Sequence, residues 1–439
     1  MDLIFEPGTS LQTIQGDCIH IDSFLARTGT GPIYKVKINR EKKVFRWYSS
    51  SMPQNYFFSV WANIRDMVNH GPPCDSILWP EAITELTNDG FGYITQFIPE
   101  AYHNLSDFLR RQVGFSSFLA TIDTTLNLIT AFRTLHNEGY CIYAHNDNIW
   151  INPVTRNVII SDPEYIVPVG ISLDVLTNPR YSAPEVVMGI GTPGWANDQY
   201  VLGVYLFMLL CRNHPLEGKR YLVPGLTPIH QKKLYGSEAL FMMDPDDHSN
   251  GPHPAIHSNT ITLWRCLPDY MRKIFESAFS QNALQRPAAR PKEIDWLKAL
   301  TRFRSEIIHC SCGNEVFIDN GKPRRCNRCN KMPVVPYHLV LNEYSIPATK
   351  GARVYRCQLG ACAANEALNP VAHIVEKKGS PGVFGIRNMT VQHWDAVTSN
   401  GVTHQVAPGE IIPLNPGITL QIFGSELVIK KVPISPQYE

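Results

Sequence analysis

The chain has 439 residues, which is too long for one ordinary domain and indicates two or three. Apolar residues make up 44% of it and charged residues 18%, so the chain can bury a sizeable core and is not disordered as a whole. A net charge of +1 argues against a nucleic-acid binder that works through bulk charge. The longest strongly apolar run, 201–211, is far shorter than the roughly 20 residues that cross a bilayer, so we expect no membrane partner.

Cysteine use favours a reducing compartment. Most of the 11 cysteines are isolated in the sequence, which is typical of small buried apolar residues in cytosolic proteins. The first residues also lack the basic start and apolar core of a secretory signal. The sequence therefore predicts a cytoplasmic protein.

The pattern of apolar and polar residues changes twice along the chain. Residues 1–100 contain short alternating runs such as 33–38 and 43–48, which predict strands of a small sheet. Residues 101–305 are rich in helical patterns, including the run at 201–210, which is apolar on every side as in a buried helix. From about residue 330 short β-type runs return, separated by Gly, Pro and Asn. The sequence therefore predicts the α+β class with a C-terminal all-β module.

Six motifs stand in the order that enzymes of the protein-kinase type require. They are a hairpin over nucleotide phosphates (25–36), a hinge (96–99), a catalytic loop (147–153), a metal-binding turn (158–164), the end of an activation segment (179–185) and the start of a helix (198–203). Each motif alone is weak, whereas the ordered set with these gaps is specific.

On these motifs the chain resembles eukaryotic-like bacterial protein kinases. Within that group it is similar to the kinase-like proteins that accompany a PP2C-type phosphatase and a von Willebrand A-domain protein in tellurite-resistance-type operons. Further similarity covers nearly the whole length, at 213–220, 244–250, 280–296, 304–313 and 384–389, with Trp394 after it. The resemblance implies that the phosphatase and the A-domain protein are its partners in bacterial phospho-signalling.

The resemblance also implies a bilobal protein-kinase-like fold followed by a zinc ribbon and an all-β sandwich. The implied parts are a kinase-like N-lobe (1–98), a kinase-like C-lobe (99–305), a zinc ribbon (306–335) and a forkhead-associated-like β-sandwich (336–439).

For the nucleotide site, the resemblance implies ATP and Mg²⁺ as ligands. Asp162 and Asn148 occupy the positions of the two Mg²⁺-binding residues, and Gly29 and Gly31 lie in the loop over the phosphates. Arg46 takes the place of the lysine that holds the phosphates. Arginine keeps the charge but is larger and planar, so it is not an equivalent phosphate holder.

Two ion pairs are expected around this site. The helix expected after the third strand, within 55–69, contains Asp66 as its one carboxylate, in place of a clearly placed Glu to pair with Arg46. In the helix-rich half, the resemblance implies that Glu185 pairs with Arg290 or Arg286 and supports the fold. It also implies that Asp198 ties down the backbone of the catalytic loop.

The catalytic loop can be aligned in two registers. One gives H-x-D-x-x-x-x-N, with Asp147 as the catalytic base and Asn152 as the metal ligand. The other, which we favour, makes 148–162 one β-hairpin and anchors the loop on Asn148. It leaves Tyr143 or Ala144, neither of which is a carboxylate, at the position of the base.

These differences favour a pseudokinase that acts as a scaffold or regulator. The alternative is an active Ser/Thr protein kinase that uses Asp147 as base and transfers the ATP γ-phosphate to a protein partner. Whether the chain binds ATP and Mg²⁺ stays open at this point.

Four cysteines stand close together: Cys310, Cys312, Cys326 and Cys329. A C-x-C pair and a C-x-x-C pair with thirteen residues between them can place four sulfurs around Zn²⁺. A four-thiolate site leaves no open position, so the zinc would be structural. The other interpretations are a redox pair and unligated thiols.

The predicted zinc ribbon and β-sandwich both contain basic residues that could bind a ligand. Arg324, Arg325 and Arg328 lie on the zinc ribbon, but three arginines on such a unit are more often a solvated face, so we expect no nucleic-acid partner. In the sandwich, Arg387 and Asn388 are candidates for phosphothreonine binding, with solvent exposure as the alternative.

Overall fold

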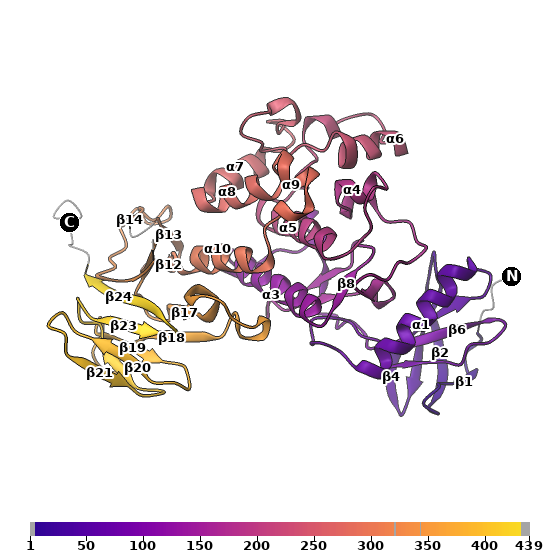
Figure 1. Ribbon diagram of the computed structural model, residues 1–439, viewed down its shortest axis with the longest axis horizontal. Helices are drawn as coiled ribbons and strands as arrows, with labels where there is room; N and C mark the ends of the chain where they lie inside the picture. The colour runs from indigo at the N-terminus through magenta and orange to yellow at the C-terminus, as the bar shows by residue number, and fades with distance from the viewer. Residues whose placement is uncertain (1–4, 320–321, 343, 432–439) are drawn as a thin grey trace. The chain divides into compact units, whose positions relative to one another are not determined.

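A computed structural model describes residues 5–319, 322–342 and 344–431 (Figure 1). The chain is 31% helix and 26% strand, and every strand ladder among the described residues is antiparallel. This mixture of helices with antiparallel sheets is compatible with the predicted α+β class.

The chain folds into two compact units. The first consists of Met1–Phe115, Ala131–Leu263 and Phe275–Arg290, and the second of Ser116–Thr130, Trp264–Ile274 and Pro291–Glu439. The four finer parts expected from the sequence stay predictions.

The first unit begins with a six-stranded sheet in the order β1-β2-β3-β4-β6-β5. Its strands are β1 (Ser10–Gln12), β2 (Cys18–Thr28), β3 (Gly31–Ile38), β4 (Glu41–Ser49), β5 (Ala82–Ile83) and β6 (Gly90–Thr95). Tyr34, Val36 and Phe45 alternate with exposed or half-buried neighbours and are fully buried in its core. The predicted alternation at 33–38 and 43–48 thus gives two neighbouring strands of one sheet.

Helix α1 (Gln54–His70) packs on this sheet. It starts after Pro53 and ends before Gly71, which has a φ of 75°. Glycine adopts such a positive φ at little energetic cost. Its buried face brings the ring of Phe57 to 5.1 Å from that of Phe91 on β6. The apolar face of the helix therefore closes one side of the sheet.

Helix α5 (Trp195–Cys211) is buried on all sides from residue 200 to its end, as its continuous apolar sequence predicts. The remaining α-helices are α2 (Leu105–Leu109), α3 (Phe118–Asn137), α4 (Pro184–Val187), α6 (Pro228–Lys232), α7 (Ser258–Cys266), α8 (Asp269–Ala278), α9 (Gln281–Gln285) and α10 (Glu293–Ser305).

Two small sheets lie within the first unit. One has the order β10-β9-β7 and the other pairs β11 with β8. Their strands are β7 (His103–Asn104), β8 (Tyr140–Ile142), β9 (Ile149–Ile151), β10 (Val158–Ile160) and β11 (Ile166–Pro168). Since β9 and β10 pair antiparallel, the hairpin on which the favoured register rests is confirmed.

The second unit contains a small three-stranded sheet made of β12 (Ile307–His309), β13 (Glu315–Asp319) and β14 (Lys322–Pro323). Its core is Ile308, Val316 and Ile318 together with Cys310 and Cys326. Three buried aliphatic side chains are few for a stable core, so such a unit gains much from an added crosslink or metal.

The same unit ends in two larger sheets, in the orders β16-β15-β24-β23-β20-β21 and β17-β18-β19-β22. The strands are β15 (Tyr337–Leu341), β16 (Tyr344–Pro347), β17 (Arg353–Tyr355), β18 (Pro370–Glu376), β19 (Phe384–Asn388), β20 (Trp394–Val397), β21 (Thr403–Val406), β22 (Ile411–Pro413), β23 (Thr419–Ile422) and β24 (Ser425–Lys431). Residues from both sheets, with Trp394 the largest, share one buried apolar cluster. The predicted all-β region is therefore present.

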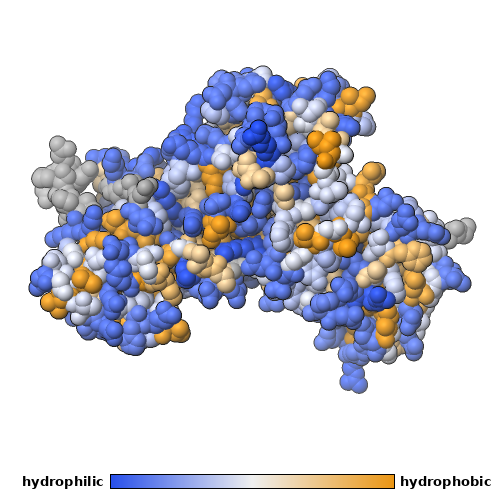
Figure 2. Space-filling view, viewed as in Figure 1, coloured by the Kyte–Doolittle hydropathy of each residue, from blue (hydrophilic) through white to orange (hydrophobic). Residues whose placement is uncertain are grey.

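Among the described residues, none of the helices combines the length and the apolar content that a membrane crossing needs. On the face drawn in Figure 2, hydrophobic residues stand in small groups among hydrophilic ones.

Candidate functional site

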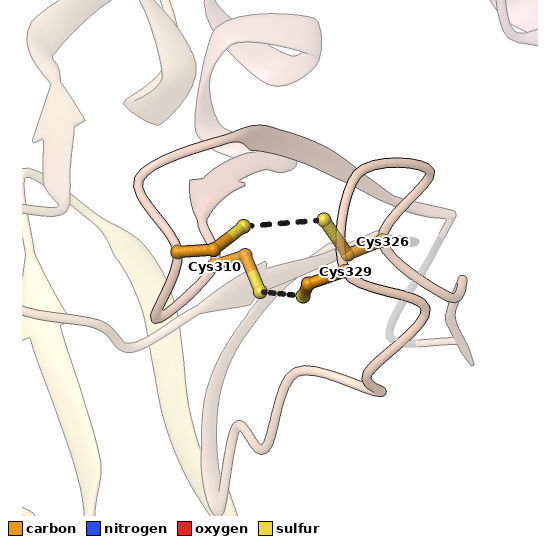
Figure 3. Close-up of side chains that lie close together, drawn as sticks. Cys310, Cys326 and Cys329 are labelled. Carbon is orange, nitrogen blue, oxygen red and sulfur yellow. Dashed lines mark hydrogen bonds between the residues drawn. The ribbon is translucent and has the colours of Figure 1, made fainter.

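The four predicted cysteine ligands meet in one cluster of the second unit. Their sulfurs all lie within 4.8 Å of one another. The Sγ atoms of Cys310 and Cys329 are 3.6 Å apart, as are those of Cys312 and Cys326 (Figure 3). All four are free thiols. Four Zn–S bonds of about 2.3 Å in a tetrahedron place the sulfurs about 3.8 Å apart, so the cluster fits such an ion.

Two tight turns present these thiols. Cys310 and Cys312 lie on the turn between β12 and β13, which ends at Gly313 with φ 83°. The second pair is followed by Asn330, which has φ 56°. Glycine and asparagine are the residues that tolerate such left-handed backbone. The sequence therefore builds two similar turns that aim their thiols at one point.

Backbone amides also favour thiolates in this cluster. The N–H groups of Cys329 and Arg328 lower the pKa of Cys326 to about 6. The N–H of Cys312 likewise lowers the pKa of the Cys310 thiol. The pKa of Cys329 is raised to about 11 instead, because burial and its three sulfur neighbours outweigh the N–H of Lys331. Because the thiolate is the form that binds metal, the backbone amides prepare two of the four thiols for a cation. The described residues thus hold a four-cysteine site compatible with structural zinc.

Two of the residues expected at a nucleotide site, Arg46 and Asp162, line a cleft of about 350 Å³ in the first unit, whereas Gly29, Gly31 and Asn148 are not part of its lining. Leu25 from β2 and Val44 from β4 lie on one side, and Trp150 from β9 lies on another. The hinge segment and Asp162 complete the lining. A volume near 300 Å³ or more and a mostly apolar wall are typical of small-molecule sites.

Arg46, on β4, lies at the inner end of this cleft. Its guanidinium donates hydrogen bonds to Glu164 and, at 3.5 Å, to Asp162. The Tyr93 hydroxyl donates to the second oxygen of Glu164 at 2.7 Å. Glu164 is only 1% exposed, so its charge depends on these two donors. The side chain expected to hold phosphates is therefore paired with two carboxylates.

Asp162 stands in an unusual backbone conformation next to Arg46. Its φ of 63° and ψ of 62° lie in the left-handed region, which Asp adopts more readily than most residues. Burial and the charge of Glu164 raise the pKa of Asp162 to about 6, although Arg46 opposes the shift. The strain and the crowding of two carboxylates mark this turn as a functional candidate.

The candidate residues of the predicted catalytic loop differ in their burial and in their hydrogen-bond partners. Asn148 is 1% exposed, its Oδ1 accepts from the Tyr205 hydroxyl at 3.1 Å, and its Nδ2 has no hydrogen-bond partner among the described residues. Asp147 is exposed, and its Oδ1 accepts from the Tyr181 hydroxyl at 2.7 Å. Asn152 caps the turn between β9 and β10 by accepting from the N–H groups of residues 154 and 155.

Two residues were candidates for the position of the base. Ala144 is buried, and Tyr143 is buried with its hydroxyl 3.1 Å from Ser172 Oγ. Neither supplies a carboxylate. The roles of Asn148, Asp147 and Asp162 toward ATP and Mg²⁺ stay predictions.

The two glycines of the hairpin differ in their surroundings. A Cβ on Gly31 would lie 2.1 Å from the carbonyl oxygen of Trp47, and its φ is 146°. Strand packing therefore already requires glycine at this position. A Cβ on Gly29 would meet nothing within 4 Å. Their predicted contact with phosphates stays a prediction.

The first unit contains two buried clusters of charged side chains. Asp198 is fully buried and accepts from the N–H of Ile142, while His145 and His136 lie 2.7 and 3.0 Å from its oxygens. Asp198 therefore holds the end of β8 and the His145 side chain just before the loop, and its contact with the backbone of the loop itself stays a prediction. Elsewhere in the unit, Arg290 donates to both oxygens of Glu185 at 2.8 and 2.7 Å, and of the two predicted partners it is the one that forms the pair.

Sequence reasoning missed Glu164. The expected carboxylate was Asp66 on α1, which is exposed and lies 3.6 Å from His70. Glu164 instead follows Asp162 within the short helical turn η1 (Pro163–Tyr165) and reaches Arg46 from there. A carboxylate two residues after Asp162, the predicted metal ligand, was the available signal in the sequence.

A comparison with models of known protein families and with curated proteins finds no match to this chain.

Proposed function

We propose that the chain is a protein-kinase-fold scaffold or regulator without phosphoryl-transfer activity, in bacterial phospho-signalling. In this proposal residues 1–98 and 99–305 form the two lobes, and the zinc ribbon and the sandwich dock partners. The partners are those that the sequence resemblance implies, a PP2C-type phosphatase and a von Willebrand A-domain protein. The cytoplasm is the proposed compartment.

The observation that carries the proposal is the pairing of Arg46 with Glu164 and Asp162. Phosphoryl transfer needs a cation that holds the phosphates and carboxylates that hold Mg²⁺. Here the cation and the candidate metal ligand are already engaged with each other and with a second carboxylate. One guanidinium against two ionised carboxylates leaves a net charge of −1 at this end of the cleft.

The loop residues support the same conclusion. A base must reach the hydroxyl of the substrate, yet the two positions at which the favoured register seeks it hold a tyrosine and an alanine. Asn148 is buried against Tyr205. In the proposal, this loop stabilises the fold and contributes no proton acceptor.

Nucleotide binding without turnover fits the cleft. Leu25, Val44 and Trp150 offer apolar surface of the kind that holds a planar base. Because the inner end is negative without a divalent cation, a triphosphate would bind there only together with Mg²⁺. Asp162 and Asn148 would hold that ion, which would neutralise the phosphates.

One observation favours the alternative, an active Ser/Thr kinase. Asp147 is exposed and directly precedes Asn148, whose carbonyl oxygen accepts from the N–H of Ser161, next to Asp162. A carboxylate at this place is a candidate base, although the Tyr181 hydroxyl now binds it.

Turnover distinguishes the two. ATP hydrolysis and autophosphorylation should be measured with Mg²⁺ or Mn²⁺ for the full chain, Asp147→Ala and Asp162→Ala. We expect all three to stay at the level of the buffer control. Activity in the unaltered chain that disappears in both variants would establish the kinase instead.

Binding needs a separate measurement. A thermal-shift titration with ATP, with and without Mg²⁺, should raise the melting temperature of the full chain only when the cation is present. Trp150→Ala should abolish that shift, whereas Trp61→Ala, an aromatic on α1 away from the cleft lining, should keep it. No shift under any condition would indicate a scaffold with an empty cleft.

A further inference from the structure

The second unit contains a pocket of about 380 Å³ whose lining is rich in arginine. The lining arginines are Arg265, Arg272, Arg302 and Arg324. They come from the end of α7, the start of α8, α10 and the segment after β14, so the fold gathers them from four places in the sequence. None of them belongs to the cysteine cluster or to the nucleotide cleft.

Arg302 is held rigidly in this pocket. Its guanidinium lies 3.9 Å from the ring centre of Tyr270 and 5.0 Å from that of Tyr344. Its Nε donates to Glu306 at 3.1 Å, and the Tyr270 hydroxyl donates to the other oxygen of Glu306 at 2.6 Å. The two terminal nitrogens of Arg302 have no hydrogen bond from the part of the chain that the structure describes. They are fixed donors that a ligand can use.

The charges around the pocket do not balance. Four guanidinium groups face two lining carboxylates, Asp269 and Asp319. Asp319 lies 3.5 Å from Arg324, and Asp269 is closer to Lys273, at 2.7 Å, than to Arg272, at 3.5 Å. Arg265 is exposed and has no ion pair among the described residues. Because Arg302 also pairs with Glu306, the four guanidinium groups meet three carboxylates, which leaves a surplus of one positive charge at the pocket.

Such a site suits an anion of compact shape. Arginine binds phosphate oxygens with two parallel N–H bonds, and a phosphate monoester carries close to two negative charges at neutral pH. The pocket is larger than one phosphate ion, and the rings of Tyr270 and Phe317 offer apolar contact to an attached side chain. We propose that this pocket binds the phosphate group of a phosphorylated serine or threonine side chain of a protein.

A nucleic-acid backbone fits less well. The chain has a net charge of only +1, and the arginines converge on one pocket, whereas a duplex needs a basic track along many phosphates. The proposal goes beyond the proposed scaffold function, since it concerns a different surface and does not depend on the nucleotide cleft.

The test uses the full chain and phosphothreonine blocked at both ends, followed by its ³¹P resonance. We expect saturable binding, no binding of blocked threonine, and affinity that falls at least about tenfold in Arg302→Gln and clearly in Arg265→Gln. Arg353→Gln, an exposed arginine of the same unit outside the pocket, should bind like the unaltered chain.

Other outcomes overturn the proposal. They are no saturable binding, unchanged affinity in both pocket variants, loss of affinity in Arg387→Gln alone, which would place the site on the sandwich, and tighter binding of a DNA duplex that the pocket variants abolish. Because Arg302 also neutralises Glu306, Arg265→Gln decides the matter if the circular dichroism of Arg302→Gln changes.

Discussion

The cysteine cluster and the nucleotide cleft differ in how they are built. The four thiols come from two local turns within twenty residues, and each turn fixes its own pair. The cleft joins Arg46 to Trp150 and Asp162, which follow it by more than 100 residues in the sequence. A local site is specified by spacing, whereas a dispersed site also depends on how each side chain points. That is why the first could be read from the sequence with more detail than the second.

The largest expected effect tests the local site. Changing Cys310, Cys312, Cys326 and Cys329 to Ser should remove about one zinc per chain, together with metal-binding free energy on the order of 10 kcal/mol. The small sheet beside the cluster should then become sensitive to protease, because its apolar core is small. Metal analysis and limited proteolysis check both points.

The control for this experiment is Cys18→Ser, an exposed cysteine of the other unit. It should keep both the metal and the protease resistance. Purified chain that contains no zinc, and that a chelator leaves unchanged, would contradict the metal site.

The next effect tests the dispersed site. Glu164→Gln removes the charge that Arg46 and Tyr93 bind, and it leaves a buried guanidinium with Asp162 alone at 3.5 Å. Breaking a buried pair from one side costs about 3–5 kcal/mol, and chemical denaturation should show a loss of this size.

The matched control is Glu81→Gln. Glu81 pairs with Lys43 at 2.9 Å on the same sheet but is half exposed, so the loss should stay below about 1 kcal/mol. Equal losses in the two variants would mean that Glu164 does not anchor the cleft.

Patterns that depend on the backbone were predictable from the sequence. The alternation at 33–38, the apolar run of α5 and the hairpin at 148–162 follow from period and turn chemistry, and the structure contains all three. The ion pair between Glu185 and Arg290 was also predicted, because the resemblance to the kinase-like proteins implied both residues.

The ion pairs within the cleft could not be predicted from the sequence in the same way. Arg46 was expected to find its carboxylate on the helix after its strand, yet α1 turns Asp66 to solvent. A helical turn at Pro163 brings Glu164 to the same guanidinium. Tertiary packing decides which of the two carboxylates reaches Arg46. The spacing of these residues along the chain carries no information about that packing. For the same reason the arginine pocket of the second unit left no signal in the sequence.

The smallest effect concerns the titration of Asp162. Its pKa is about 6 in the folded chain against an ordinary value of 3.8, so the folded state binds the proton more tightly than the unfolded chain does. The resulting stabilisation is complete below about pH 4 and is lost as the pH rises through 6. Asp162→Asn removes this titration, so the unaltered chain should lose at most about 3 kcal/mol relative to the variant between pH 4 and 7.

Denaturation midpoints of the two proteins across this range test the sign as well as the size. Groups far from Asp162 titrate in the same way in both proteins, so their contributions cancel to first order in the difference. A difference that stays flat, or that grows in favour of the unaltered chain as the pH rises, would mean that Arg46 stabilises the Asp162 carboxylate more than burial and Glu164 destabilise it. Asp162 would then be ionised across this whole range, the two carboxylates and one guanidinium would keep a net charge of −1 at the inner end of the cleft, and a triphosphate would still need the divalent cation to enter.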